Sequence, residues 1–149
     1  AGRIAVLALE LQDIKSLMNC LLREEGFDPF GVAAAEIRGQ ARFTIDGHTP
    51  EGELVTWGYL RPVVFAMVRG KEKPRRLKLT LSAPANWLEK IDPAAAACLL
   101  NLHYEGDRAQ VTTGRTARGF SLDKSADALW DDAVKRFLQK QGLAFRELI

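Results

Sequence analysis

The chain has 149 residues, of which 47% are hydrophobic and 27% charged, and its formal net charge is +2. This length and balance suit one globular domain spanning residues 1–149 with a sizeable core, and they argue against a disordered chain. The net charge is too small to identify a nucleic-acid-binding protein by itself.

The start of the chain predicts a strand, a helix and a hairpin. Alternating leucines predict a half-buried strand over residues 5–11. Apolar residues spaced at i, i+3, i+4 and i+7 predict an amphipathic helix over residues 12–25. Two alternating segments, residues 32–38 and 41–46, predict a β-hairpin whose tight turn is Gly39-Gln40.

The segment from Trp57 to Arg69 has two interpretations. Its apolar run, residues 63–68, fits a buried strand or a buried helix. Pro62 suits the first turn of a helix, so we favour the helix.

The second half predicts a similar series of elements. They are a strand at 77–81, a short helix at 84–91 that could extend to residue 97, strands at 99–105, 108–113 and 118–122, and a helix at 126–141. Gly114 is expected to end the second of these last three strands, and Ser125 to cap the final helix.

The two halves share one layout of strand, helix, strands and helix, over residues 4–70 and 75–142. Phe43-Thr44-Ile45-Asp46 in the first half resembles Phe120-Ser121-Leu122-Asp123 in the second. We therefore predict an α+β fold in which an antiparallel sheet has its helices on one face and the halves are pseudo-repeats. The alternative is that an α+β domain has reused common elements without duplication.

The residue types most often used in catalysis have structural explanations here. Cys20 and Cys98 lie among leucines and alanines, which indicates buried thiols and a reducing compartment. His48 and His103 lack the spacing of metal ligands, so we expect no metal site. No apolar run reaches the roughly 18 residues of a membrane span, and we expect a cytoplasmic protein without a membrane partner.

The remaining polar residues favour no particular reaction. Asp46 and Asp123 each end a predicted strand, where aspartate commonly bonds local backbone amides. Thr113 and Arg115 lie in a hydroxyl-rich segment that lacks the spacing of a phosphate-binding loop and suits a turn, although an anion could contact Arg115 there. These four are the best enzymatic candidates, but we expect no catalytic residue and no cofactor, and we lean against an enzyme.

The densest charge lies in the segment of residues 69–78, which joins the two halves and contains six basic residues and one acid, Glu72. A solvated linker is one interpretation, because basic residues suit the end of a helix. A patch that contacts phosphates is the other.

Basic residues at outward strand positions would extend such a patch over the open face of the sheet. The full candidate set is Arg38, Arg42, Arg69, Lys71, Lys73, Arg75, Arg76, Lys78, Arg108 and Arg115. The predicted face lacks aromatic residues for stacking on bases, so it fits a duplex backbone or a protein partner better than single-stranded RNA.

Five short motifs are spread over the chain: Leu60-Arg61-Pro62-Val63-Val64-Phe65, Arg69-Gly70-Lys71, Thr112-Thr113-Gly114, residues 120–125 and Trp130-Asp131. Together they resemble an uncharacterised bacterial family of domains of unknown function. The resemblance covers nearly the whole chain, but it implies no activity and assigns no functional residue.

The predicted layout is also similar to the saddle of TATA-box-binding proteins, which bind DNA with an open sheet face and insert phenylalanine wedges. Outward positions here offer no obvious phenylalanine, and each half is shorter. The likeness therefore concerns architecture and not DNA bending.

Our first hypothesis is a non-enzymatic binding module that contacts nucleic-acid phosphates through residues 69–78 and the open sheet face. The alternative is a protein-interaction or dimerisation module, which includes a homodimer. Arg38, Arg42, Lys78 and Arg108 on one face beside residues 69–78 would favour nucleic acid, and scattered charges would favour a protein partner.

Overall fold

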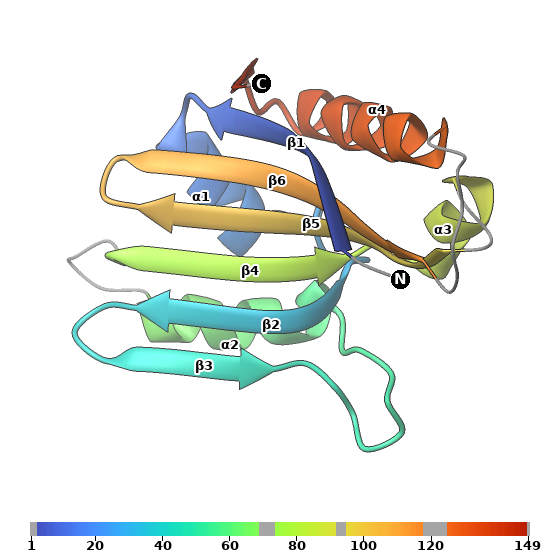
Figure 1. Cartoon of the computed structure of the whole chain (residues 1–149). Helices are drawn as coiled ribbons and strands as arrows, with labels where there is room; N and C mark the ends of the chain where they lie inside the picture. Colours follow the sequence, from blue (N-terminus) through green and yellow to red (C-terminus); the bar gives the residue numbers. More distant parts are fainter. Residues whose placement is uncertain (1–2, 69–73, 92–94, 118–124, 149) are drawn as a thin grey trace.

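The computed structural model describes residues 3–68, 74–91, 95–117 and 125–148. Within them, seven strands form one antiparallel sheet in the order β3-β2-β4-β5-β6-β1-β7, accompanied by four helices (Figure 1). The elements are β1 (Arg3–Leu11), α1 (Ile14–Leu22), β2 (Gly31–Arg38), β3 (Arg42–Asp46), α2 (Trp57–Val68), β4 (Arg76–Ser82), α3 (Ala85–Ile91), β5 (Ala95–Glu105), β6 (Arg108–Ala117), α4 (Ser125–Lys140) and β7 (Phe145–Glu147). The predicted α+β class is confirmed.

The helices α1 and α2 pack behind one face of the sheet, and no helix of the described residues covers the opposite face, which we call the open face (Figure 1). α1 carries the chain from β1, near one edge, to β2, near the other, while β4, β5 and β6 form a meander between them. Alternation explains this division, since Leu77, Leu79 and Leu81 of β4 are at most 2% exposed and Lys78 between them is exposed.

An aromatic cluster joins the helices at one end of the core. Phe27, in the loop after α1, meets Phe137 of α4 edge-on with ring centroids 5.0 Å apart. Trp87 of α3 lies 5.3 Å from Phe30 and 6.3 Å from Trp130 of α4. These contacts hold α3 and α4 against the same core as α1.

The segment with two interpretations is a helix, as we favoured. α2 is apolar almost all round, and Trp57, Leu60 and Val64 form its buried side. Pro62 lies inside the helix and not in its first turn, because α2 begins at Trp57.

Three details of the second half differ from prediction. Residues 95–97 belong to β5, in which Ala95 and Ala97 pair with β6, so the proposed helical extension to residue 97 is wrong. Gly114 does not end β6, since it pairs with Leu99 and the strand continues to Ala117. β7 was not predicted, and the strand expected at 118–122 lies outside the described residues.

The pseudo-repeat is not confirmed. The order of elements does recur, as β1-α1-β2-β3-α2 and then β4-α3-β5-β6-α4. The pairing of strands does not recur, because β4 is the neighbour of β5 whereas β1 is separated from β2 by three strands. Residues 120–123, one of the two matching segments, lie outside the described residues.

Gly47 follows β3 where the backbones of two strands approach closely. A Cβ atom added at Gly47 would lie 1.7 Å from the carbonyl oxygen of Val32, a rigid backbone atom, whereas one added at Gly39 would meet nothing within 4 Å. We therefore expect Gly47→Ala to lower the free energy of unfolding by about 1–3 kcal/mol or more, and Gly39→Ala to leave it nearly unchanged. Denaturant titration of both variants checks this, and equal effects would contradict it.

Candidate nucleic-acid interface

The strand register gathers basic side chains at one end of the open face. Arg38 of β2 is the direct partner of Arg42 in β3 and, on its other side, of Arg76 in β4. Lys78 lies two residues along β4, opposite Glu36. We call Arg38, Arg42, Arg76 and Lys78 the basic corner.

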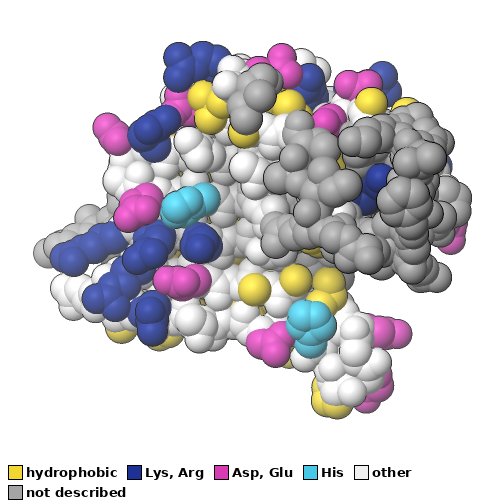
Figure 2. All heavy atoms as spheres, viewed as in Figure 1, with side chains coloured by type: hydrophobic (Ala, Val, Ile, Leu, Met, Phe, Trp, Pro, Cys, Tyr) yellow, Lys and Arg dark blue, Asp and Glu magenta, His cyan; other side chains and the backbone are white. Residues whose placement is uncertain are grey.

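Figure 2 shows Lys and Arg side chains crowded over the ends of β2, β3 and β4 on this face. Arg38, Arg42 and Lys78 are exposed and Arg76 is partly exposed. Among the described residues, no carboxylate lies within ion-pair distance of the four side chains. The corner is therefore a local concentration of positive charge, although Glu36 lies opposite Lys78 without forming an ion pair.

Arg108 of β6 lies on the same face, separated from Arg76 by Glu105 of β5, and unlike the basic corner it forms an ion pair. Its Nη2 lies 2.8 Å from a carboxylate oxygen of Glu10, and its Nε donates to the same oxygen at 2.9 Å. Arg146 of β7 donates to the other oxygen of Glu10. The hydrogen bond from Arg108 holds the pKa of Glu10 below its ordinary value of 4.5, with a further contribution from Arg146.

Glu105, the register partner of both Arg76 and Arg108, places one acid beside the corner. Its carboxylate lies 3.5 Å from Nε2 of His103. His103, Glu105, Arg108 and Gln110 line a shallow open depression of about 230 Å³ on this face. The open face is thus positive at the β2–β3–β4 end and mixed in charge toward β6 and β1.

The remaining candidates from the 69–78 segment divide into two groups. Arg75 is exposed, and its backbone N–H donates to the carbonyl of Arg38 at 2.6 Å, so this part of the segment adjoins the corner. Arg69, Lys71 and Lys73 lie outside the described residues.

Arg115 does not share the surface formed by the other candidates. Because β6 continues through Gly114, the side chain of Arg115 points to the helix-covered face, where it is 8% exposed. Thr113, on the same face, is fully buried and donates to Oδ1 of Asp131 at 2.7 Å. The turn expected over residues 112–116 is wrong, and this error put Arg115 on the surface.

The residues considered for catalysis are not gathered by the structure. Asp46 accepts hydrogen bonds from the backbone N–H of His48 at 3.0 Å and lies 2.7 Å from its ring Nδ1, and Asp123 lies outside the described residues. Cys20 and Cys98 are buried thiols, as expected. Burial raises the pKa of the Cys20 thiol to about 11, which disfavours the nucleophilic thiolate.

A larger hollow, of about 490 Å³, lies between α3 and α4. Trp87 and Phe137 supply its apolar part, and Lys90, Arg136 and Lys140 surround it. Neither Asp46, Thr113 nor Arg115 lines this hollow or the depression on the open face.

Sequence reasoning did not include Glu10 or Arg146 in the candidate site. Glu10 alternates with the buried leucines of β1, which was a sufficient signal for its outward direction. Arg146 belongs to the three-residue β7, too short for its alternation to be recognised.

The chain matches a family of unknown function, DUF5721, over residues 20–146, and it therefore belongs to that family. This confirms the resemblance to an uncharacterised family. No curated protein and no solved structure matches the chain, so the likeness to TATA-box-binding proteins is not confirmed. Of the helices in the described residues, none combines the length and apolar character needed to cross a membrane.

Proposed function

We propose that this member of the DUF5721 family is a non-enzymatic binding module whose open sheet face contacts the phosphates of duplex nucleic acid. The observation that carries the proposal is the row Arg42-Arg38-Arg76, in which three arginines are direct neighbours across three strands. Lys78 extends the same charge to the next row.

Such a row is unfavourable for the fold on its own. Like charges directly opposite each other on neighbouring strands destabilise a sheet by a fraction of a kcal/mol per pair. Strands lie about 4.8 Å apart, so the three guanidinium groups can reach several adjacent anionic oxygens at once. Phosphate contacts would offset the mutual repulsion of the row and release counterions from the nucleic acid.

The open face favours a duplex over an unpaired strand. Its described positions contain no Phe, Tyr or Trp on which bases could stack. The arginines are aligned across the strands, and the next row on the same face consists of Thr44, Glu36 and Lys78. This arrangement suits recognition of a regularly spaced backbone and not of individual bases.

The proposal is tested by titrating the protein into fluorescently labelled duplex DNA and duplex RNA and following anisotropy at several salt concentrations. With four basic side chains on phosphates, the plot of log K against log salt should have a slope of about −3 to −4. Absence of binding to both duplexes at low salt would overturn the proposal, as would binding that does not depend on salt.

Removing the negative charge of Glu10 is expected to strengthen duplex binding. Glu10→Gln should release Arg108 and Arg146 from their ion pairs, so the affinity for a duplex should rise about threefold and the salt slope should steepen by up to about two units. The same anisotropy assay measures it, and a weaker affinity would contradict it.

The same substitution also bears on stability at low pH. Since the folded pKa of Glu10 is lowered, its carboxylate contributes stability above about pH 4.5, and that contribution disappears as the pH falls through the folded pKa. Any stability difference between Glu10→Gln and the unsubstituted chain should therefore shrink below pH 4.5.

A further inference from the structure

The strand β3 forms one edge of the sheet and is not covered by any described element. It lies at the end of the strand order and pairs only with β2. Four of its five residues are exposed, and Phe43, on the helix side, is 38% exposed. An edge strand presents a row of unpaired backbone N–H and C=O groups that can accept another strand.

The sequence of β3 is complementary to itself in the antiparallel direction. If two copies of Arg42-Phe43-Thr44-Ile45-Asp46 pair about Thr44, each Arg42 faces the Asp46 of the second copy, and each Phe43 faces an Ile45. Thr44 then faces Thr44. Opposite charges, apolar pairs and Thr–Thr pairs are the cross-strand combinations that stabilise a sheet.

Both charges of this pairing are accessible in a single chain. The side chain of Asp46 is 79% exposed, and its recorded hydrogen bonds with His48 use Oδ1, which leaves Oδ2 for a further donor. The hydrogen bond from the His48 backbone holds the pKa of Asp46 below its ordinary value, so the group is ionised at neutral pH. Arg42 is exposed and has no carboxylate partner among the described residues.

The helix α2 adds an apolar surface on the same side of the molecule. Tyr59, Val63 and Met67 recur every four residues along one line of the helix, and they are 70%, 47% and 37% exposed. Figure 1 shows α2 lying behind the β2–β3 end of the sheet. Exposed apolar side chains grouped in this way mark interaction surfaces.

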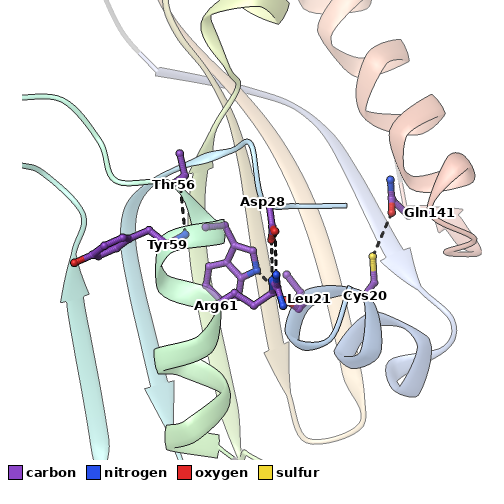
Figure 3. Close-up of polar contacts among 8 residues, drawn as sticks. Cys20, Leu21, Asp28, Thr56, Tyr59, Arg61 and Gln141 are labelled. Atoms are coloured by element: carbon purple, nitrogen blue, oxygen red, sulfur yellow. Dashed lines mark hydrogen bonds and ion pairs between the residues drawn. The ribbon is translucent and has the colours of Figure 1, made fainter. Parts of the chain in front are cut away.

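The stripe faces away from α1 and therefore toward the β3 edge. Arg61, on the opposite side of α2, donates to Asp28 at 2.9 and 3.1 Å, in the loop that follows α1. Figure 3 shows Tyr59 pointing to the other side of the helix from Asp28 and Leu21. Phe65 also faces α1, with the guanidinium carbon of Arg23 5.8 Å from its ring centroid.

We infer that two copies of this chain form a symmetric dimer in which β3 pairs with β3 of the second copy and the apolar stripes of the two α2 helices meet. A second copy is the occupant because it supplies the complement of both features at once: Asp46 for Arg42 at each end of the strand, and a matching apolar stripe. A two-fold axis through the Thr44 pair makes such an interface self-complementary.

The dimer would join the two sheets into one. In an antiparallel strand pair the two-fold axis is perpendicular to the sheet, so the open faces of both copies lie on the same side. Arg38, Arg76 and Lys78 stay accessible there, while each Arg42 is engaged by Asp46 of the second copy. The inference does not depend on nucleic-acid binding, and its test measures only the mass of the particle.

The test is sedimentation equilibrium of the whole chain and of single charge-reversal variants. The unsubstituted protein should have twice the mass of the chain. Arg42→Asp and Asp46→Arg should each raise the dissociation constant about tenfold or more, because two symmetric pairs change from attraction to repulsion. Both positions are exposed, so each variant should fold, and circular dichroism is used to check this.

The most specific test is sedimentation equilibrium of an equimolar mixture of the Arg42→Asp and Asp46→Arg variants. A chain carrying Arg42→Asp is complementary at both ends to a chain carrying Asp46→Arg, so the mixture should form heterodimers although each variant alone is mainly monomeric. Val63→Glu should also favour the monomer, whereas Leu129→Glu, at an exposed position of α4 away from this edge, should not. A monomeric unsubstituted chain, a dimer indifferent to the single substitutions, or a mixture that stays monomeric would each overturn the inference.

Discussion

Replacing both Arg38 and Arg76 by glutamate is expected to lower the affinity for duplex nucleic acid by about 100-fold or more at low salt. These two residues are the centre and one end of the arginine row, and both have an arginine as a direct neighbour. A hydrogen bond to a charged group contributes about 1.5–3 kcal/mol, so the loss of two such contacts corresponds to at least two powers of ten. The reversed charges would in addition repel phosphates.

The salt dependence of the affinity distinguishes direct phosphate contacts by Arg38 and Arg76 from a general effect of the net charge of the protein. If Arg38 and Arg76 each neutralise a phosphate, the slope of log K against log salt should become about two units shallower. The control is a variant with Lys15→Glu and Arg136→Glu, which makes the same change of net charge at exposed positions of α1 and α4. Equal losses in the two double variants would mean that the basic corner has no special part in binding.

The substitution Trp57→Ala is expected to lower the free energy of unfolding by about 3–5 kcal/mol, a large part of the stability of an ordinary domain. Trp57 begins α2, is completely buried, and donates its indole N–H to the carbonyl of Leu21 at 2.8 Å. Leu21 lies in the last turn of α1, where carbonyl groups have no partner within the helix. Trp57 therefore fills the core and satisfies the end of a second helix.

Trp57→Phe separates these two contributions. It retains most of the packing but leaves the Leu21 carbonyl without its donor, which should cost about 1–3 kcal/mol. Trp87→Phe is the matched control, because Trp87 is only partly buried and its indole N–H makes no hydrogen bond among the described residues. Denaturant titration gives the three values, and a Trp57→Phe loss no larger than that of Trp87→Phe would contradict the role of the hydrogen bond to Leu21.

Side-chain periodicity was sufficient to predict which strand residues face the core. Leu77, Leu79 and Leu81 alternate with outward residues, and the structure buries all three. The same alternation placed Arg38 and Lys78 outward, as observed. These predictions were reliable because side-chain direction in a strand depends only on neighbouring positions along the chain.

Prediction was less accurate where composition conflicted with the tertiary context. The alanine-rich residues 95–97 favour a helix, but they extend β5 because β6 offers them a ladder of hydrogen bonds. Gly114 is a common strand breaker, yet it is held between β5 and β1. This error affected the predicted site: because β6 is continuous, the side chain of Arg115 points toward the core and not to the open face.

Side-chain periodicity alone predicts the α+β class, the outward direction of Arg38, Arg42 and Lys78, and the apolar character of α2. The row of Arg42, Arg38 and Arg76 depends on which strands are neighbours in the sheet, and periodicity does not predict this. The chain order of strands differs from their order in the sheet, where β4 lies beside β2 and β1 lies beside β6. The hydrogen bonds that join strands are made by the backbone, which is the same in every residue, so the choice of neighbours depends on how α1 and α2 pack over the whole core. That choice brought dispersed basic residues together and left β3 at an edge.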